Sequence, residues 1–331
     1  MRFRTYPGTD ITVSEVGFGV WTVSTTWWGG GGGEADAVRL LQRALERGIT
    51  LYDTADTYGD GQGESVLAKA FAGHRHEIVI ATKFGYDFYH HTGERGQREL
   101  PQDFTPAFIR YAVEQSLKRL GTDYIDLYQM HNPRLAALED GAVFETLAAL
   151  QREGKIRLYG VALGPAIGWR DEGLFALERR RVPSLHMIYN LLEQDPGRDL
   201  LSAAREARAG VLVRVPHSSG MLEGKYTLET TFPPTDHRSH RPREWLVNGL
   251  KQVEKLRFLT EDTGRTLGQA ALRFVLAEPK VMSALPNIYD EEQLAEFVGA
   301  SECPDLTREE LERIEDLYAH SFYLEAAGAP A

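Results

Sequence analysis

Short apolar runs alternate with longer stretches of helical periodicity along most of this chain. Apolar runs of about 4 to 8 residues are typical of strands buried on both faces, and apolar residues at every third or fourth position are typical of amphipathic helices. The pattern predicts eight strands, at 16–19, 50–53, 78–82, 125–130, 158–162, 185–188, 211–215 and 281–285. Helices are predicted between them, for example at 35–47, 106–120, 142–152, 200–209 and 267–277.

This alternation predicts an α/β fold, a (β/α)8 TIM barrel, because eight strand–helix units in 331 residues match the usual size of such a barrel. A doubly wound sheet is the competing arrangement. It is disfavoured because Gly17 and Gly19 are followed by Thr22 where a dinucleotide-binding G-x-G-x-x-G motif needs its third glycine.

The two ends of the chain add to the barrel. Residues 2–13 predict an N-terminal β-hairpin with a turn at 7–10, and residues 307–318 predict an extra C-terminal helix. We expect a single domain over 1–331, with a hairpin cap at 1–15 and a tail at 319–331, disordered from Ala326.

Composition narrows the function. A net charge of −11 argues against nucleic acid or an anionic membrane surface as the partner. Cys303 is the only cysteine, so no internal disulfide can form, and no run approaches about 18 apolar residues. We expect a cytoplasmic protein that binds small molecules; the sequence does not indicate its oligomeric state.

Four chemically reactive side chains follow three consecutive predicted strands. Asp53 ends the second strand and Tyr58 comes five residues later, while Lys83 and His131 end the third and fourth strands. Each has an ordinary structural explanation alone, as a turn cap, a packed ring, a solvated charge or a turn histidine. Together, at one end of a barrel, they suit carbonyl reduction. The alkoxide formed by hydride transfer needs a proton, an ammonium favours ionisation of a phenol, and an imidazole can orient the carbonyl oxygen.

The chain resembles the aldo-keto reductase superfamily over nearly its whole length. The matching stretches are GFGVW at 17–21, LYDTADTYG at 51–59, ATKFG at 81–85, DYIDLYQMHNP at 123–133, GKIRLYGVA at 154–162, YNLLEQ at 189–194, GMLEGKY at 220–226 and TLGQAALRFVLAEP at 266–279. The resemblance implies hydride transfer between a nicotinamide cofactor and an aldehyde, ketone, alcohol or sugar. It also implies the catalytic residues Asp53, Tyr58, Lys83 and His131, with Tyr58 as general acid and base.

The resemblance also implies a cofactor site across the mouth of the barrel. Small residues and a lysine after the seventh strand suit a pyrophosphate, because backbone N–H groups can approach it closely. The implied cofactor-binding residues are Trp21, Asp53, His186, Arg214, Ser218, Ser219, Gly220, Met221, Gly224, Lys225, Asn287, Tyr289 and Gln293.

Several positions depart from the family pattern. Ala162-Leu163 replaces a Ser-Asn pair, His186 replaces a glutamine, and Arg214 stands where an aromatic ring usually stacks on the nicotinamide. Tyr289, followed by three acidic residues, replaces the usual cation for the 2′-phosphate. The family default is NADP(H), and these substitutions make NAD(H) a second possibility.

Aromatic residues on the predicted mouth loops suggest a pocket for a carbonyl compound or a sugar: Trp27, Trp28, Tyr86, Phe88 and Tyr89.

Two alternative functions have weaker support in the sequence. A metal-dependent hydrolase is disfavoured because the His74-x-His76 pair precedes the third strand and the His90-His91 pair has no partner at metal-ligand spacing, so no metal is expected. A catalytically weak, cofactor-binding regulatory subunit of the same fold also remains open.

Overall fold

The computed structural model describes residues 1–25, 33–91, 99–164 and 168–324. Its centre is a barrel of eight parallel strands hydrogen-bonded in chain order from β3 to β10. Their bounds are Phe18–Gly19 (β3), Leu51–Asp53 (β4), Val79–Phe84 (β5), Ile125–His131 (β6), Ile156–Ala162 (β7), Ser184–Ile188 (β8), Gly210–Arg214 (β9) and Val281–Leu285 (β10). All eight predicted strands are present, which confirms the TIM barrel.

The barrel is closed by a short contact between its first and last strands. Val16, just before β3, forms a parallel bridge with Ala284 of β10. The Ala284 amide donates to the Glu15 carbonyl over 2.8 Å, and the Gly17 amide donates to the Ala284 carbonyl over 2.9 Å. Closure removes the free sheet edges that an open parallel sheet would leave.

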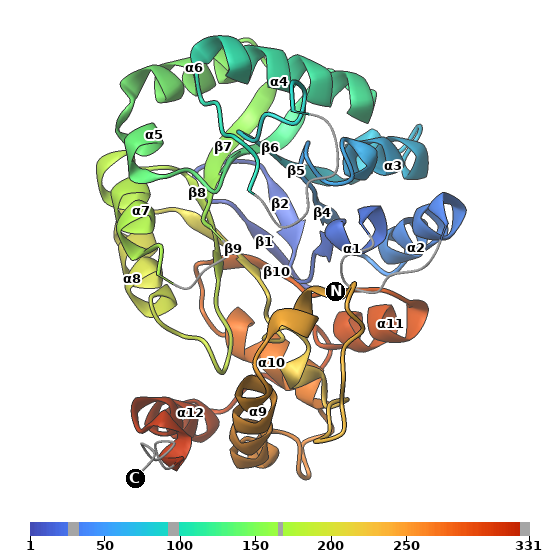
Figure 1. The fold of residues 1–331 in the computed structure, drawn as a ribbon, viewed down its shortest axis with the longest axis vertical. Helices are drawn as coiled ribbons and strands as arrows, with labels where there is room; N and C mark the ends of the chain where they lie inside the picture. The colour runs from blue at the N-terminus through green and yellow to red at the C-terminus, as the bar shows by residue number, and fades with distance from the viewer. Residues whose placement is uncertain (26–32, 92–98, 165–167, 325–331) are drawn as a thin grey trace.

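Helices form a ring outside the strands, as Figure 1 shows. Their apolar faces pack on the barrel, which is why the strands are buried on both sides. Their bounds are Trp21–Ser24 (α1), Glu34–Glu46 (α2), Gln62–Ala70 (α3), Pro106–Leu120 (α4), Leu135–Glu139 (α5), Gly141–Arg152 (α6), Arg170–Leu174 (α7), Gly197–Ala207 (α8), Arg243–Lys255 (α9), Leu267–Leu276 (α10), Glu291–Gly299 (α11) and Arg308–Ala319 (α12).

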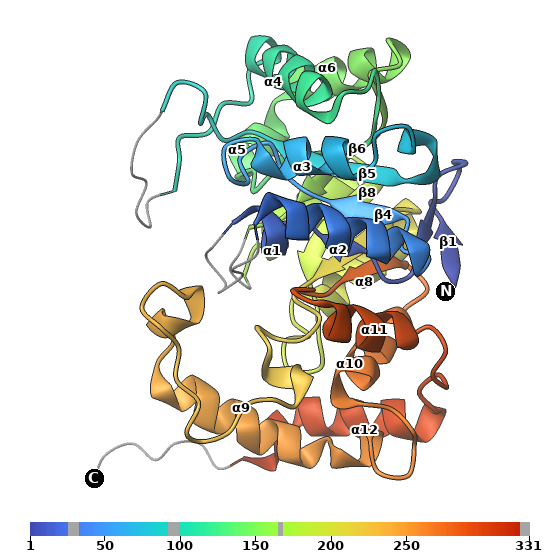
Figure 2. The same ribbon diagram turned by 90° about the vertical axis from the view of Figure 1, so that its right-hand side faces the viewer.

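The predicted N-terminal hairpin is present at one end of the barrel. Strands β1 (Phe3–Thr5) and β2 (Thr12–Ser14) pair antiparallel. Tyr6, Ile11 and Val13 from the hairpin are buried with apolar side chains of the barrel interior. Figure 2 shows the hairpin at the end opposite the loops that follow β3 and β5. The hairpin therefore covers the amino ends of the strands and leaves the carboxyl ends, here called the mouth, available for a site.

The predicted C-terminal helix is α12, which lies outside the helical ring beside α9 (Figures 1 and 2). The Tyr318 hydroxyl accepts hydrogen bonds from the amides of Gln194 and Asp195, both over 3.1 Å. The Arg313 guanidinium lies 4.0 Å from the centre of the Phe258 ring. The helix is thereby attached to the loop after β8 and to the segment after α9. The end of the predicted tail, from residue 325, falls outside the described residues.

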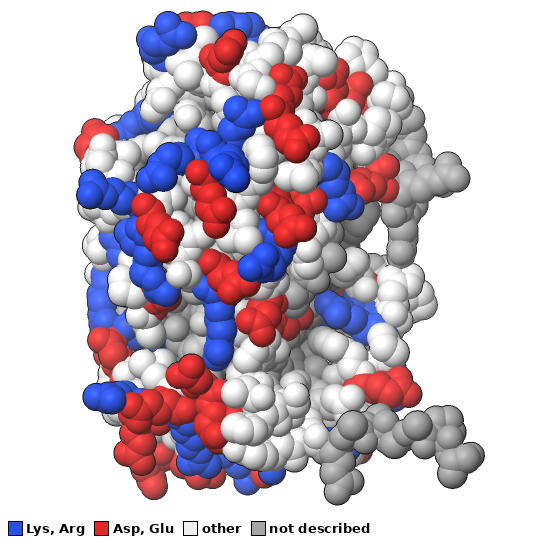
Figure 3. Space-filling model, turned by 90° about the vertical axis from the view of Figure 1, so that its left-hand side faces the viewer, with Lys and Arg blue, Asp and Glu red and all other residues white. Residues whose placement is uncertain are grey.

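The surface gives two further observations. In the part of the chain that is described, no helix combines the length and the apolar character that a membrane crossing requires. The face in Figure 3 carries basic and acidic side chains interspersed over most of its area. A single-sign surface of the kind that binds nucleic acid is not seen on this face.

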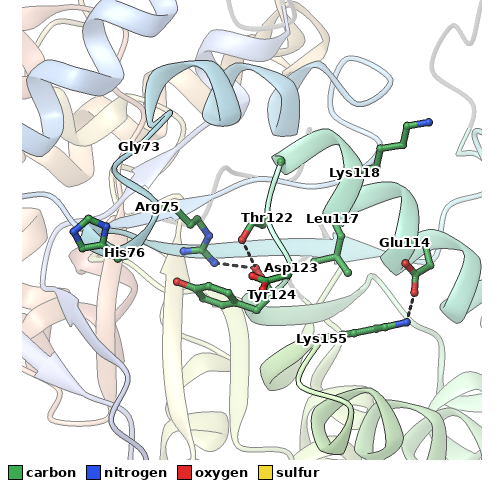
Figure 4. A pocket seen from close by; sticks show the side chains of 11 residues that line it. Gly73, Arg75, His76, Glu114, Leu117, Lys118, Thr122, Asp123, Tyr124 and Lys155 are labelled. Carbon is green, nitrogen blue, oxygen red and sulfur yellow. Dashed lines mark hydrogen bonds and ion pairs between the residues drawn. The ribbon is translucent and has the colours of Figure 1, made fainter.

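A surface depression of about 920 Å³ lies at the amino ends of the strands, opposite the mouth (Figure 4). Arg75 at its edge forms an ion pair with Asp126 over 2.7 Å, and Lys155 pairs with Glu114. His76, one of the two histidines of the H-x-H pair, also lines it. Among the described residues, no group of three or more side chains could hold a metal ion.

Candidate active site

The strand ends bring the four predicted catalytic residues together at the mouth. Asp53 is the last residue of β4, Lys83 lies next to the end of β5, and His131 is the last residue of β6. Tyr58 stands on the loop between β4 and α3. Because these strands are adjacent and parallel, residues at their carboxyl ends face a common space.

Lys83 is the centre of this group and is fully buried. Its Nζ donates to Asp53 Oδ1 over 2.6 Å and to the Thr54 carbonyl over 2.7 Å, and it lies 3.5 Å from the Tyr58 hydroxyl. The Gln129 amide donates to Asp53 Oδ2 over 3.2 Å. Burial raises the pKa of Asp53 above its usual value, and the nearby Lys83 ammonium offsets only part of this shift. A buried carboxylate and ammonium thus hold each other in fixed positions beside the phenol.

The Tyr58 ring is held between two other rings. Its centre lies 4.8 Å from that of Trp21 in an edge-on arrangement and 5.8 Å from that of His131. The following residue, Gly59, has φ 57°, and a Cβ there would lie 2.5 Å from the Ser24 carbonyl oxygen. Only glycine fits this turn, so the sequence Tyr-Gly places the phenol at the mouth.

His131 is a neutral hydrogen-bonding group at this site. Burial, and then the charges of Lys83 and Arg214, keep the pKa of His131 well below its usual value. Its Nδ1 is buried, with no hydrogen-bond partner among the described residues. The Gln102 amide donates to the His131 carbonyl over 2.8 Å and fixes the backbone beneath the ring. A neutral imidazole can hydrogen-bond a carbonyl oxygen without adding a charge.

Two substituted positions lie next to the catalytic group. His186 Nδ1 is 3.8 Å from Asp53 Oδ2, and neither of its ring nitrogens has a hydrogen-bond partner in the described structure. Burial, together with the Lys83 and Arg214 charges, keeps the pKa of His186 well below its usual value. The Arg214 Nη2 donates to the carbonyls of Leu163 and Gly164 over 2.7 and 2.6 Å. These unsatisfied nitrogens and this guanidinium suit the polar nicotinamide amide, which an apolar lining would not.

The loop after β9, predicted to hold the pyrophosphate, is a tight turn of left-handed residues. Ser218, Ser219 and Gly220 have successive φ values of 46°, 57° and 92°. A Cβ on Gly220 would lie 2.3 Å from the Tyr226 hydroxyl, which donates to the Ser219 carbonyl over 2.8 Å. Met221 is buried, Gly224 has φ 73°, and Lys225 is exposed. The amides of Ser218, Gly220 and Met221 donate to carbonyls within the loop, to Val215, His217 and Ser218, so these bonds hold the tight turn together.

The acidic residues after β10 also have a structural role in the fold. Asp290 accepts a hydrogen bond from the Gln293 amide over 2.8 Å and caps α11, and Glu291 and Glu292 occupy the first turn of that helix. These acids therefore complement the helix dipole. Gln293 Oε1 accepts from the Tyr289 amide over 3.0 Å, and Gln293 Nε2 donates to Glu223 Oε2 over 3.1 Å. Asn287 is half-buried nearby.

A cation that sequence reasoning did not assign lies near Tyr289. Arg238 stands in the 3₁₀ segment His237–His240. Burial raises the pKa of Tyr289, and the positive charge of Arg238 opposes that shift. Arg238 pairs with Asp236 through two contacts of 2.8 and 2.6 Å and donates to the Tyr226 hydroxyl over 2.7 Å. No local sequence signal links Arg238 to Tyr289, because about fifty positions separate them in the chain.

The predicted pocket aromatics divide into two groups. Tyr86 lies edge-on to His131 at 4.9 Å between ring centres, so it borders the catalytic group. Tyr89 instead points its hydroxyl at Asp56 and Arg119, over 3.4 and 2.9 Å, and Phe88 packs on Tyr89. Trp27 and Trp28 lie outside the described residues.

Tyr89 belongs to a buried polar network that sequence reasoning missed. Glu64 is fully buried and accepts hydrogen bonds from Thr82 and Arg119, both over 2.7 Å. Burial and the neighbouring Glu64 raise the pKa of Asp56 well above its usual value. Asp56 stands in the same D-T-A-D-T-Y motif as Tyr58, and this shared motif is the one feature of the sequence that points to the network. The network therefore connects the Tyr58 loop, strand β5 and the loop after it.

Comparisons with known proteins agree with this geometry. The model of the Aldo/keto reductase family matches residues 15–319. The chain belongs to the aldo-keto reductase family. It is 34% identical over 305 residues to the aldo-keto reductase YhdN of Bacillus subtilis, covering 86% of this chain and 84% of that protein. It is 30% identical over 298 residues to the aldo-keto reductase yakc [NADP(+)] of Schizosaccharomyces pombe, covering 87% and 84%.

Among solved structures, the glycerol dehydrogenase AKR11B4 from Gluconobacter oxydans superposes with a TM-score of 0.82, 31% identity and 99% coverage of each chain. The predicted family and the predicted enzyme class are thereby confirmed. Members of this aldo-keto reductase family are oxidoreductases that use nicotinamide cofactors and act on carbonyl groups.

Proposed function

We propose that this aldo-keto reductase reduces the carbonyl group of a small aldehyde, ketone or sugar, or oxidises the corresponding alcohol, with Tyr58 as its general acid and base. The observation that carries the proposal is the position of Lys83 Nζ between Asp53 Oδ1 and the Tyr58 hydroxyl, at 2.6 and 3.5 Å. An ammonium at this place stabilises the phenolate that remains after the proton has moved to the substrate oxygen.

Each of the other residues has a separate task in this proposal. Bound nicotinamide supplies the hydride acceptor or donor. Asp53 keeps Lys83 charged and in place, and the neutral His131 imidazole holds the substrate oxygen near Tyr58. Trp21 and Tyr86 border the space where the carbonyl group must lie, since their rings pack against Tyr58 and His131.

The proposal for the cofactor rests on two groups of residues at the mouth, one for the nicotinamide end of the cofactor and one for its adenosine end. His186 and Arg214 would hold the nicotinamide amide, and the loop 218–225 would hold the pyrophosphate. At the adenosine end, the charge of Arg238 is largely compensated by Asp236. We therefore expect both NADP(H) and NAD(H) to serve, with little discrimination between them.

A comparison of wild type with Tyr58→Phe tests the function. We expect the variant to lose about 100-fold or more in the rate of cofactor oxidation with an aldehyde panel, as removal of a general acid requires. Cofactor binding, followed by tryptophan quenching, should remain unchanged. Tyr323→Phe, at an exposed tyrosine far from the mouth, is the matched control.

The same assay separates the alternative function. Equal rates in wild type and Tyr58→Phe would remove Tyr58 from the mechanism. Tight cofactor binding with no turnover on any aldehyde, ketone or sugar would instead favour the cofactor-binding regulatory subunit.

A further inference from the structure

Tyr89 attaches the loop after β5 to two neighbouring elements. Its hydroxyl donates to Asp56 Oδ2 over 3.4 Å and accepts from Arg119 Nη2 over 2.9 Å. Asp56 lies on the loop that carries Tyr58, and Arg119 lies in the last turn of α4. Helices α3 and α4 lie side by side outside the barrel (Figures 1 and 2). One hydroxyl thus joins three separate segments of the chain.

Both partners of Tyr89 are fixed by further hydrogen bonds. Asp56 is fully buried, and its backbone amide donates to the Lys83 carbonyl over 3.2 Å. Arg119 Nε donates over 2.7 Å to Oε2 of Glu64, which is fully buried in the first turn of α3. Buried polar networks make the segments that they join rigid. Tyr89 is therefore bound to a rigid part of the barrel wall.

The same loop carries a ring that borders the reacting group. Tyr86, three residues before Tyr89, lies edge-on to His131, with 4.9 Å between the ring centres. The backbone between the two tyrosines is tight, since the Phe88 amide donates to the Tyr86 carbonyl over 3.0 Å. Tyr86 also forms a backbone bridge with Gln102, whose side-chain amide donates to the His131 carbonyl. A displacement of Tyr89 therefore changes the wall of the site beside His131.

Ring contacts hold Tyr89 in addition to its hydrogen bonds. Its ring centre lies 4.0 Å from that of Phe88, 6.0 Å from that of Phe108 and 5.1 Å from that of Tyr111. A phenylalanine in place of Tyr89 would keep these contacts and lose only the hydroxyl. Tyr111 is 44% exposed, and within the described residues its hydroxyl makes no hydrogen bond. The cluster thus contains one tyrosine hydroxyl that joins segments and one that does not.

We propose that the Tyr89 hydroxyl is a positioning group: by fastening the loop after β5 to the buried network, it keeps Tyr86 in place beside His131. The inference rests on the proposed reductase function, in which these two residues border the carbonyl group. Tyr89 itself acts at a distance, through Tyr86. The cofactor, assigned to residues of β8, β9 and the loop after β9, does not depend on this wall.

Removal of the hydroxyl tests the inference. We expect Tyr89→Phe to lower kcat/KM for benzaldehyde about tenfold, because a misplaced wall costs rate although no reacting group is lost. The Kd of the reduced cofactor, followed by tryptophan quenching, should remain unchanged. Tyr111→Phe removes a hydroxyl from the same aromatic cluster and is the matched control, which should change neither quantity. Unchanged kcat/KM in Tyr89→Phe would overturn the inference.

A double variant shows whether Tyr89 acts through Tyr86. Tyr86→Ala removes the ring beside His131, so the hydroxyl of Tyr89 has nothing left to position. In that background, adding Tyr89→Phe should lower kcat/KM less than about twofold, since residues that act as a unit do not contribute additively. A further tenfold loss would show that the two act independently, against the inference.

Asp56 provides a second pair of variants. Burial raises the pKa of Asp56 well above its usual value, so its neutral carboxyl resembles the amide of asparagine. Asp56→Asn should therefore keep a hydrogen bond to Tyr89 and most of the activity, while Asp56→Ala should reproduce the loss seen in Tyr89→Phe. Equal kcat/KM in the two Asp56 variants would contradict the proposed hydrogen bond.

Failure of the inference and failure of the proposed function are distinguishable. If wild type turns over no carbonyl compound, the proposed function is wrong, and amide hydrogen exchange then decides the inference. The Asp87 and Asp103 amides close the loop by bonds to the Pro101 and Gly85 carbonyls, both over 2.8 Å. These amides should exchange faster in Tyr89→Phe than in wild type, and equal exchange would overturn the inference.

Discussion

Lys83 donates a hydrogen bond to Asp53 over 2.6 Å, and both side chains are buried at the carboxyl ends of neighbouring strands. Neither charge is tolerated alone in this place, because burial without a partner disfavours the ionised form. The pair therefore links the stability of the fold to the position of the proposed proton donor.

Removing the ammonium tests this link. We expect Lys83→Met to lower the free energy of unfolding by about 3 to 5 kcal/mol, since Asp53 would lose its buried partner. It should also abolish most of the activity. Urea unfolding measures the first effect, and the double variant Asp53→Asn/Lys83→Met should recover part of the stability but none of the activity. A stable, active Lys83→Met protein would contradict the proposed role of the pair.

Buried histidines make the fold sensitive to mild acid. Burial lowers the pKa of His217 to about 4, from a usual value of 6.5. The unfolded chain binds this proton more readily, so the contribution to stability is complete above pH 6.5 and is lost as the pH falls from 6.5 toward 4. The difference amounts to about 3 kcal/mol over that interval.

Comparing wild type with His217→Gln isolates this contribution. We expect the unfolding free energy of the variant to depend less steeply on pH between about pH 6.5 and pH 5, because one titrating group is absent. His131 and His186 contribute in the same direction in both proteins, since burial also lowers their pKa values. Parallel pH profiles would refute the assignment to His217.

Asp236 is expected to set the cofactor preference. Its carboxylate compensates the charge of Arg238 and accepts the Arg238 backbone amide. Asp236→Asn preserves that cap but frees the guanidinium for a 2′-phosphate, so NADPH affinity should rise about tenfold relative to NADH affinity. Binding constants for both cofactors, measured by tryptophan quenching, provide the check. An unchanged ratio would place the 2′-phosphate away from Arg238.

The network behind Tyr58 predicts a compensating pair of substitutions. Arg119→Met leaves Glu64 fully buried without its cation, and we expect a loss of about 3 to 5 kcal/mol in unfolding free energy. Adding Glu64→Gln should restore much of it, because the remaining group is neutral. Thermal or urea unfolding of the single and double variants gives the coupling. Additive losses would show that the two residues do not act as a pair.

The sequence by itself determined the elements and the order of the barrel. Hydrophobic periodicity is local, and parallel strands covered by helices produce it directly, so the predicted strands match those from β3 to β10. It also predicted that Asp53, Tyr58, Lys83 and His131 lie close together, since residues at successive strand ends must meet at one mouth.

The tertiary structure decided which distant side chains share a space. Closure of the barrel through Val16 and Ala284 joins segments about 270 positions apart. The loop after β9 carries Arg238 to Tyr289, and β9 directs Arg214 toward the carbonyls that follow β7. Such contacts depend on the register of the strands and on the path of the loops, and the hydrophobic periodicity of the sequence carries no information on either. For this reason the sequence placed Arg214 only against a nicotinamide ring, and only the structure shows that its guanidinium donates to the carbonyls of Leu163 and Gly164.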